Sequence, residues 1–303
     1  MDDFSTDAIP DLSGTTAVVT GANSGLGLQS ALVLAAKGAR VELACRDRQR
    51  GAAARERIRT ETGNDNVHLR QLDLASLASI RRFAAEQEKP VDLLINNAGV
   101  MATPHRTTAD GFELQFGVNH LGHFALTGLL LPALRQAPAP RVVTVSSLAH
   151  RGGRIDFEDL AAQRSYRPWN RYNQSKLANL LFTFEFQRRL TAHGEKILAV
   201  AAHPGFANTN LTAGMNHPAT LDVLGAFFRL LGQSGASGAL PTLYAATALE
   251  VRGGEFYGPG GPGQLRGRPA LVTPAPQASD PETARRLWDI STELTGVRFA
   301  GLD

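Results

Sequence analysis

A tyrosine and a lysine lie four residues apart in the stretch YNQSK, as Tyr172 and Lys176. On a helix this spacing places both side chains on one face. A free phenol has a pKa of about 10, and a neighbouring ammonium group favours the phenolate, which can exchange a proton with an alcohol or a carbonyl. Burial alone would raise the pKa of the phenol, so the cation is necessary. We therefore expect Tyr172 to be a general acid and base whose pKa Lys176 lowers.

Two serines, Ser146 and Ser147, follow the apolar stretch RVVTV. A serine hydroxyl beside Tyr172 would hold the reacting oxygen and stabilise the charge that develops on it. The alternative is that both serines only cap the end of a strand. Because Tyr-x-x-x-Lys pairs also occur by chance on solvated helix faces, neither motif decides the function alone.

A glycine-rich loop, GANSGLG, lies between an apolar run and a helical pattern. Small residues let the backbone approach a pyrophosphate, and the first N–H groups of a helix favour anions, so the loop predicts a dinucleotide site. The alternative is a tight turn with close contact between helix and strand. The loop residues expected to contact the cofactor are Gly21, Asn23, Ser24, Gly25, Leu26 and Gly27.

The second apolar run ends on Arg46. In NAD-preferring folds an acid at this place accepts hydrogen bonds from the adenosine ribose, which a guanidinium cannot do. A guanidinium can instead pair with a 2′-phosphate, so Arg46 predicts NADP(H) in preference to NAD(H). Two alternatives are an exposed arginine beside a helix and a strand register shifted by one residue, which would place Asp47 near the ribose.

Short apolar runs alternate with helical patterns along most of the chain, and most runs are continuous, as expected of strands covered on both faces. This alternation predicts an α/β fold, a doubly wound parallel sheet with helices on both faces, in a single domain spanning 1–303. Its core is expected at about 13–260, followed by an irregular loop (258–277) and a closing helix (280–296). The expected strands are 16–20, 40–45, 67–72, 91–95, 141–146 and 197–202, and the expected helices are 25–38, 48–62, 76–89, 110–136 and 170–193.

Composition excludes several classes of function. The formal charge of the 303 residues is +3, and the basic residues form no stripe, so nucleic-acid binding is not indicated. The one cysteine, Cys45, cannot form an internal disulfide, which fits a reducing compartment. The first residues show no signal-peptide pattern, and the longest apolar segments are too short to span a membrane. We therefore expect a cytoplasmic protein without a membrane anchor.

The glycine loop with its leading Thr20 resembles the nucleotide loop of the short-chain dehydrogenase/reductase (SDR) family. Similar to the family are also NNAG at 96–99, the SSLAH stretch at 146–150 and the YNQSK stretch. The connection between Ser147 and Tyr172 is longer than in typical members. Together with ACRD, NHLGHF and SKLANLLF, it resembles the branch of the retinol dehydrogenases, the WW-domain oxidoreductase and protochlorophyllide reductase. The resemblance covers about 14–257 and implies a Rossmann-type fold.

The resemblance assigns roles to further residues. It implies that Ser147 binds substrate and that Asn119 holds a water that relays protons to Lys176; a satisfied mid-helix amide is the alternative for Asn119. It implies that Asp73 meets the adenine, although a helix N-cap describes Asp73 equally well. The implied catalytic residues are Asn119, Ser147, Tyr172 and Lys176, and the further implied cofactor contacts are Asp73, Leu74, Asn97, Ala98, Gly99, Tyr172, Lys176, Pro204, Gly205 and Thr209.

The activity implied by the resemblance is NADP(H)-dependent interconversion of a carbonyl and an alcohol. The positive ring of the oxidised nicotinamide is expected to act together with Lys176 in lowering the pKa of Tyr172. The insert between Ser147 and Tyr172 is expected to wall an apolar substrate cleft with Phe157, Tyr166 and Trp169, or else to be a surface excursion. A non-catalytic NADPH sensor is the alternative. The stretch GQSGA at 232–236 does not complete a serine-hydrolase motif, and no metal site is expected at His120 and His123. By analogy with the fold, a homodimer or homotetramer is expected.

Overall fold

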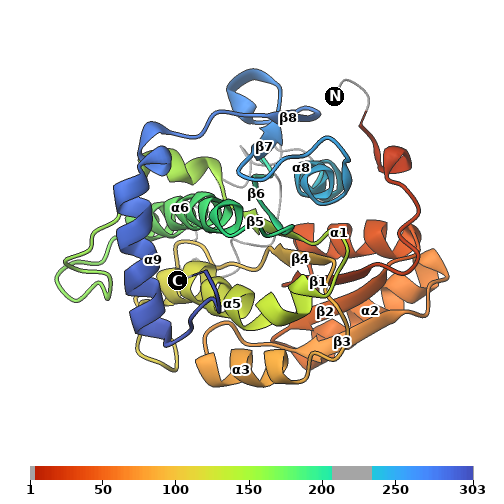
Figure 1. The fold of residues 1–303 in the computed structure, drawn as a ribbon, viewed down its shortest axis with the longest axis horizontal. Helices are drawn as coiled ribbons and strands as arrows, with labels where there is room; N and C mark the ends of the chain where they lie inside the picture. The colour runs from red at the N-terminus through yellow and green to blue at the C-terminus, as the bar shows by residue number, and fades with distance from the viewer. Residues whose placement is uncertain (1–3, 207–233, 303) are drawn as a thin grey trace.

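The computed structural model describes residues 4–206 and 234–302, and within them one eight-stranded sheet forms the centre of the molecule (Figure 1). The strand order is β3-β2-β1-β4-β5-β6-β7-β8, and every neighbouring pair is parallel except β7 and β8. The strand order reverses direction at β1 and β4, which places a crevice at their carboxyl ends. The strands are β1 Thr16–Thr20, β2 Arg40–Cys45, β3 Val67–Gln71, β4 Leu93–Asn96, β5 Arg141–Val145, β6 Leu198–Ala202, β7 Phe256–Pro259 and β8 Pro269–Leu271.

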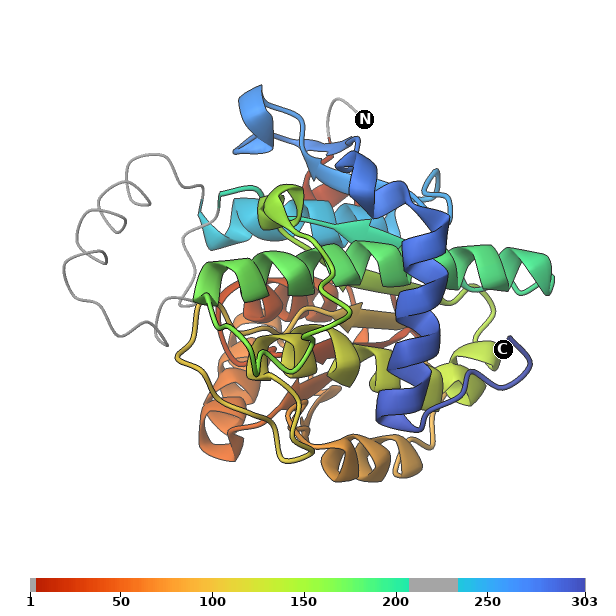
Figure 2. The same cartoon turned by 90° about the vertical axis from the view of Figure 1, so that its left-hand side faces the viewer.

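Helices cover both faces of this sheet (Figure 1). One face carries α1 Gly25–Ala36, α2 Arg48–Thr62 and α8 Gly235–Thr247, and the other carries α3 Leu77–Ala85, α5 Gly122–Arg135 and α6 Pro168–Ala192. Figure 2 shows the last long helix, α9 Pro281–Thr295, lying across the outside of α6. The shorter helical segments are η1 Thr6–Ala8, α4 Leu114–Phe116, η2 Gly117–Leu121, η3 Leu148–Gly152, η5 Pro262–Gln264 and η6 Pro276–Ser279.

The strands are apolar without alternation because both of their faces are buried. In β1, Ala17 and Val19 pack with α1, whereas Val18 between them packs with α5. All three side chains are completely buried. Two layers of apolar side chains therefore hold the sheet between the helices, as in other doubly wound folds.

The six expected strands and the five expected helices are confirmed, apart from shifts at their ends. The clearest shift is in the helix expected at 110–136, which begins only at Leu114. Gly111 has a φ of 85°, and Glu113 caps the helix by accepting hydrogen bonds from the N–H groups of Gln115 and Phe116 at 2.8 Å each. The helix expected at 76–89 already ends at Ala85.

The C-terminal part of the chain contains a correct and a partly correct expectation. The closing helix is confirmed, since Asp280 caps α9 and Pro281 is its first residue. The irregular loop expected at 258–277 is correct for most of this segment, but the expectation missed β8 and the end of β7, which form a hairpin. Within residues 4–206 and 234–302, no helix combines the length and the apolar character needed to cross a membrane.

Candidate active site

The glycine loop follows β1 and opens α1, as the sequence predicts. Gly21 and Gly25 have φ values of 65° and 55°, in the left-handed region that glycine tolerates best. Gly27 is in tight contact with the loop: a Cβ on it would lie 2.5 Å from Asn97 Nδ2 and 2.6 Å from the carbonyl oxygen of Gly21. The absence of side chains at these positions therefore lets the chain turn tightly here.

One hydroxyl joins the glycine loop to the NNAG turn after β4. Thr20, the last residue of β1, accepts hydrogen bonds at its Oγ1 from the N–H groups of Asn97 and Ala98, both at 2.9 Å. Asn97 also donates from its side-chain nitrogen to the carbonyl oxygen of Thr20 at 2.8 Å. Hydrogen bonds thus join two loops that are about 75 residues apart in sequence. We call these two loops, residues 20–27 and 96–99, the glycine ledge.

The start of α1 fits a phosphate group. Its N-cap residue, Ser24, makes no side-chain hydrogen bond to the helix. The first N–H groups of a helix otherwise lack partners and attract anions. Together with the contacts around Gly27, which leave no room for a side chain, this arrangement fits the pyrophosphate of a dinucleotide.

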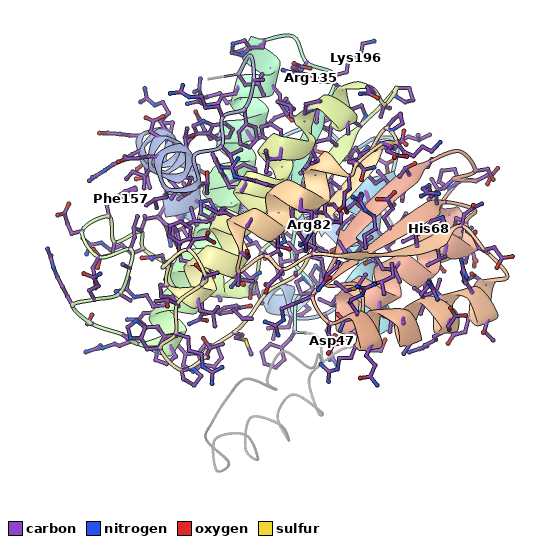
Figure 3. All side chains as sticks on the ribbon, turned by 90° about the horizontal axis from the view of Figure 1, so that it is seen from below. Asp47, His68, Arg82, Arg135, Phe157 and Lys196 are labelled. Carbon is purple, nitrogen blue, oxygen red and sulfur yellow. The ribbon has the colours of Figure 1, made fainter. Side chains whose placement is uncertain are left out.

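Arg46 lies directly after β2 and is exposed. The neighbouring Asp47 is the N-cap of α2, and its carboxylate accepts a hydrogen bond from the N–H of Arg50 at 2.9 Å. Figure 3 shows Asp47 at the edge of the molecule where β2 passes into α2. Asp47 therefore serves as a helix cap, and Arg46 precedes it with an exposed side chain.

Asp73 and Leu74 follow β3 closely. Asp73 accepts a hydrogen bond at Oδ1 from the N–H of Ala75 at 2.9 Å, while the N-cap of α3 is Ser76. The alternative view of Asp73 as the cap of the next helix is therefore wrong. Leu74 is buried, and its carbonyl oxygen would lie 2.6 Å from a Cβ on Gly122, so this loop packs tightly on the start of α5.

Tyr172 and Lys176 lie one turn apart on α6 and are almost completely buried, with exposed fractions of 5% and 4%. The ring of Tyr172 packs with Met101, Ala102 and Ala149. Lys176 donates from Nζ to the carbonyl oxygen of Val145, the last residue of β5, at 3.1 Å, and its Nζ lies 5.9 Å from the centre of the Tyr172 ring. The helix thus presents both groups at the carboxyl end of β5.

Burial dominates the electrostatics of this pair. It raises the pKa of Tyr172 to about 12, against which a hydrogen bond with Ser147 acts in the opposite direction. Burial also lowers the pKa of Lys176 to about 8. Desolvation of the phenol therefore decides the direction in the protein alone. The expected lowering of the Tyr172 pKa, by Lys176 together with an oxidised nicotinamide, stays a prediction. The protein by itself keeps Tyr172 as a neutral acid.

The two serines after β5 have different partners. Ser146 donates its hydroxyl to the carbonyl oxygen of Lys176 at 2.7 Å and so fixes α6 to the sheet. Ser147 is the N-cap of η3, where its Oγ accepts from the N–H of Ala149 at 3.2 Å, and it is the serine that reaches the hydroxyl of Tyr172. Ser147 therefore acts as a cap and faces the phenol at once.

Asn119 lies in η2, a π-helical segment that interrupts the helix before α5. Such insertions occur often at functional sites. Its side chain accepts from the N–H of Val100 at 2.8 Å and donates to the carbonyl oxygen of Val100 and to Ser175 Oγ, both at 2.9 Å. Ser175 in turn donates to the carbonyl oxygen of Tyr172 at 2.8 Å. The side-chain amide is thus satisfied, and the expected water relay between Asn119 and Lys176 stays a prediction.

Gly99 connects the NNAG turn to this group. A Cβ on Gly99 would lie 3.2 Å from Asn119 Oδ1 and 3.6 Å from Lys176 Nζ. The structure therefore brings the turn after β4, the π-helical segment and α6 together in one place, as the positions of the motifs predict.

The turn after β6 contains Pro204 and Gly205. Gly205 has a φ of 64°, and a Cβ on it would lie 2.5 Å from the carbonyl oxygen of Leu265. Its N–H donates to His203 Nδ1 at 3.1 Å. Thr209, the third residue expected here, lies outside the described residues.

The insert between Ser147 and Tyr172 places its three aromatic residues differently. Trp169 is 43% exposed and packs edge-to-face against Tyr172, with ring centres 6.2 Å apart. Tyr166 donates its hydroxyl to the carbonyl oxygen of Thr103 at 2.7 Å. Phe157 lies beside α9 (Figure 3), where its ring packs under the guanidinium of Arg286. Of the three, only Trp169 packs against Tyr172.

Two buried residues that the sequence did not single out for this role, His123 and Gln115, form hydrogen bonds that position parts of the site. His123 Nε2 lies 3.0 Å from Thr20 Oγ1, and its Nδ1 lies 2.9 Å from the carbonyl oxygen of Asn119, so this buried ring joins the glycine ledge to the π-helical segment. Gln115 accepts at Oε1 from the N–H of Ala102, which has a φ of 46°. The spacing of His123 from Asn119, one helical turn, is the signal that could have found it.

Two other motifs have structural partners. His120 Nε2 lies 2.9 Å from Ser291 Oγ of α9, and among the described residues no three or more His, Cys, Asp or Glu side chains gather as metal ligands would. Ser234 of the GQSGA stretch is the N-cap of α8 and accepts from the N–H of Ser237 at 3.2 Å.

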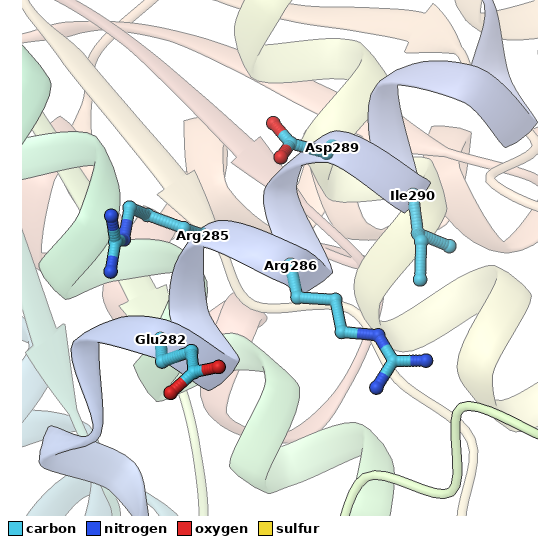
Figure 4. A pocket seen from close by; sticks show the side chains of 5 residues that line it. All are labelled: Glu282, Arg285, Arg286, Asp289 and Ile290. Carbon is cyan, nitrogen blue, oxygen red and sulfur yellow. The ribbon is translucent and has the colours of Figure 1, made fainter.

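A separate surface depression lies away from this site, on α9. Figure 4 shows that all five of its lining side chains come from one face of that helix. They are Glu282, Arg285, Arg286, Asp289 and Ile290.

Comparison with known proteins agrees with this geometry. The family model described as short chain dehydrogenase matches residues 15–219. Retinol dehydrogenase 13 from Homo sapiens is 49% identical over 296 residues, which cover 94% of this chain and 86% of that protein. A crystal structure of an uncharacterized protein from Mycobacterium paratuberculosis is 46% identical, with a TM-score of 0.82 and 98% of each chain covered.

A more distant structure, the RhlG/NADP active-site complex from Pseudomonas aeruginosa, is 26% identical. The superposition covers 81% of this chain and 94% of the Pseudomonas aeruginosa chain, with a TM-score of 0.63. The match to the family model spans more than half of the chain, and the match to retinol dehydrogenase 13 is nearly complete. The chain therefore belongs to the short chain dehydrogenase family of oxidoreductases and is retinol dehydrogenase-like.

Proposed function

We propose that this protein is an NADP(H)-dependent oxidoreductase that interconverts a carbonyl and an alcohol, with Tyr172 as the general acid and base. One observation carries the proposal: the buried hydroxyl of Tyr172 meets Ser147 at the carboxyl edge of the sheet that also carries the glycine ledge. By resemblance to the family, Asn119, Ser147, Tyr172 and Lys176 are the catalytic residues.

The chemistry divides between cofactor and protein. Bound NADPH supplies a hydride to the carbonyl carbon, and its oxidised ring carries a positive charge. Tyr172 donates its proton to the carbonyl oxygen, for which its raised pKa makes the neutral phenol available. Ser147 donates a hydrogen bond to the same oxygen and stabilises the developing alkoxide. In the reverse direction Tyr172 must first lose its proton, and Lys176 provides the neighbouring positive charge.

The residues around the glycine ledge support NADP(H) over NAD(H). Arg46 is exposed after β2, and Asp47 is engaged as a helix cap, so no free carboxylate meets the ribose at this position. A guanidinium suits a 2′-phosphate. The Pseudomonas aeruginosa structure is an NADP complex of that protein. The proposed contacts to the cofactor are Gly21, Asn23, Ser24, Gly25, Leu26, Gly27, Arg46, Asp73, Leu74, Asn97, Ala98, Gly99, Tyr172, Lys176, Pro204, Gly205 and Thr209.

We propose an apolar substrate. Met101 packs with Tyr172 on one side, and Trp169 packs on it from the preceding turn of α6 while keeping 43% of its surface exposed. Aromatic and aliphatic surfaces beside the reacting group favour an apolar carbonyl or alcohol. The relative named retinol dehydrogenase 13 makes retinal and retinol sensible members of a substrate panel. A cytoplasmic location, a single domain over 1–303 and a homodimer or homotetramer remain part of the proposal.

A substrate screen tests this function. The purified protein is mixed with NADPH or NADH and a panel of aldehydes, ketones and quinones that includes retinal, and loss of absorbance of the reduced cofactor is followed. We expect turnover with an apolar carbonyl and a preference for NADPH. If no compound is reduced while NADPH still raises the melting temperature, the protein is a cofactor sensor instead.

A further inference from the structure

His150 lies three residues after Ser147 and is completely buried. Its Nδ1 donates to the carbonyl oxygen of Ser147 at 2.6 Å, and its Nε2 accepts from the N–H of Ala275 at 3.1 Å. The ring also packs edge-to-face on Phe256 of β7, with ring centres 5.5 Å apart. Both nitrogens of one neutral imidazole are thus used to join the serine of the active site to a segment 125 residues later in the chain.

The C-terminal segment contacts η3 at a second position. Gln277 donates from Nε2 to the carbonyl oxygen of Arg151 at 2.9 Å, with longer contacts of 3.4 Å to the carbonyl oxygens of His150 and Gly153. These oxygens belong to the short helical segment that Ser147 caps and to the residue that ends it. The C-terminal segment therefore satisfies the carbonyl groups at the end of η3, which that segment cannot satisfy itself.

The opposite side of η3 is pressed against α6. A Cβ on Gly153 would lie 2.6 Å from the carbonyl oxygen of Asn173 and 2.8 Å from Cβ of Leu177. Asn173 directly follows Tyr172 in the sequence. η3 therefore lies between α6 and the C-terminal segment, with Ser147 as its N-cap.

We propose that His150 is a positioning residue that holds Ser147 against Tyr172, by anchoring η3 to the C-terminal residues Ala275 and Gln277. The inference rests on the proposed function, since it gives Ser147 a catalytic task. The C-terminal part of the chain, which closes the fold as β8, η6 and α9, is then also part of the catalytic framework.

A double-mutant cycle tests this role. His150→Leu removes both ring hydrogen bonds, and His150→Gln offers an amide donor and acceptor in their place. We expect His150→Leu to lower kcat about tenfold or more with little change in KM for NADPH, and His150→Gln to restore part of the loss. In a Ser147→Ala background, His150→Leu should cause little further loss, because the serine that it positions is gone.

The pH profile of alcohol oxidation gives a second readout. The hydrogen bond from Ser147 favours ionisation of Tyr172. His150→Leu should therefore move the rising limb of kcat/KM for the alcohol, which reports the enzyme before the alcohol binds, to higher pH, as Ser147→Ala does. The double variant should move it no further than Ser147→Ala alone. A residue with only a structural role would lower the melting temperature and leave this limb in place.

Two further variants keep the test decisive. Gln277→Ala removes the contacts to η3 from a partly exposed side chain and should reproduce the shift of the pH profile if His150→Leu fails to fold. Asn64→Ala is the matched control: it removes side-chain hydrogen bonds of 2.8 and 2.9 Å to the carbonyl oxygens of Ala35 and Ala39, at the opposite edge of the sheet. It should lower the melting temperature without changing the pH profile.

The outcomes separate this inference from the proposed function. Losses that simply add in the cycle, or an unchanged pH profile in both His150→Leu and Gln277→Ala, would overturn the role of His150 while leaving the enzyme assignment intact. A wild-type protein without turnover would refute the proposed function itself, and with it any catalytic task for His150, before the variants are compared.

Discussion

The site has two sides that are built in different ways. The nucleotide side, formed by residues 20–27 and 96–99, consists mainly of glycines and main-chain groups joined by the hydroxyl of Thr20. The chemical side, formed by Asn119, Ser147, Tyr172 and Lys176, consists of side chains, two of which are ionisable and buried. The shape of the nucleotide side depends on the absence of side chains at its glycines. The properties of the chemical side depend instead on the burial of its side chains.

The protein alone gives the nucleotide side its shape but does not give Tyr172 a pKa near neutrality. The nucleotide side already has its shape, because Gly27 and Asn97 are in contact and the start of α1 has no side-chain cap. The chemical side has a tyrosine whose pKa burial raises to about 12, which suits proton donation and opposes proton removal. We therefore expect a cofactor bound at the nucleotide side to lower the pKa of Tyr172 on the chemical side.

The largest expected effect comes from Tyr172→Phe on the chemical side. The variant keeps the ring in its packing with Met101 and Ala102 but removes the proton donor. We expect kcat to fall by about 10²–10⁴-fold, the usual contribution of general acid–base catalysis, with the affinity for NADPH little changed. Steady-state kinetics and a fluorescence titration with NADPH measure the two quantities. Turnover close to that of the wild type would remove Tyr172 from the mechanism.

A smaller effect is expected from Gly27→Val on the nucleotide side. The new side chain would collide with Asn97 Nδ2 and the Gly21 carbonyl, at 2.5 and 2.6 Å from its Cβ. Overpacking of this kind costs about 1–3 kcal/mol, and if displacement of the loop carries this cost into binding, NADPH affinity falls about 5- to 150-fold. Gly235→Ala is the matched control, since its Cβ would meet only Gln29 at 3.6 Å. Equal NADPH affinities in the two variants would contradict the shape that we assign to this side.

Arg46→Asp sharpens the comparison at the outer end of the nucleotide side. A charged hydrogen bond to the 2′-phosphate contributes about 1.5 kcal/mol or more, so its loss should change the ratio of NADPH to NADH affinity about tenfold in favour of NADH. Arg57→Asp changes the net charge equally from the middle of α2 and should leave the ratio unchanged. Parallel changes in both variants would indicate a general charge effect instead of a contact.

Acid should weaken the whole fold through four buried histidines, His120, His123, His150 and His203, whose pKa burial lowers. Burial lowers the pKa of His120 and His203 to about 3 and that of His123 to about 4, from an ordinary 6.5. The unfolded chain therefore binds protons first, and stability that is present above pH 6.5 is lost progressively toward pH 4 and below. Glu113, whose pKa burial raises, acts in the opposite direction.

We expect the melting temperature to fall by several degrees between about pH 7.5 and pH 5, a smaller effect than those on binding and turnover. Calorimetry across this range measures it. His123→Gln removes one of these titrating rings, the one that joins Thr20 to Asn119. The variant should therefore show a smaller slope of melting temperature against pH. A melting temperature that stays constant across the same range would contradict neutral, buried histidines.

The sequence predicts the nucleotide side better than the chemical side. Strands, glycines and turns are specified by neighbouring residues, so the loop after β1 and the turn after β4 lie where their motifs predict. The pKa of Tyr172 depends instead on Met101, Ala102 and Ala149, which come from other parts of the chain. Their packing could not be seen in the spacing of Tyr172 and Lys176, so the sequence did not show how far burial would raise this pKa.

The C-terminal segment shows the same limit. Glycine and proline in 258–277 predict a loop, yet β8 forms because β7 offers it a free edge. His150 follows Ser147 in the sequence, but its partner Ala275 lies in the part of the chain with the weakest pattern. Contacts between distant segments, which no local pattern records, thus hold Ser147 and the short helical segment after it.

Titration of the Tyr172 phenol tests the central claim most directly. The absorbance difference between the wild type and Tyr172→Phe is followed against pH, with and without saturating NADP⁺. We predict that the protein alone keeps Tyr172 protonated far above neutral pH, in line with its pKa of about 12, and that NADP⁺ lowers this pKa by about 3 units. The same pKa with and without NADP⁺ would contradict the claim that binding at the nucleotide side completes the chemical side.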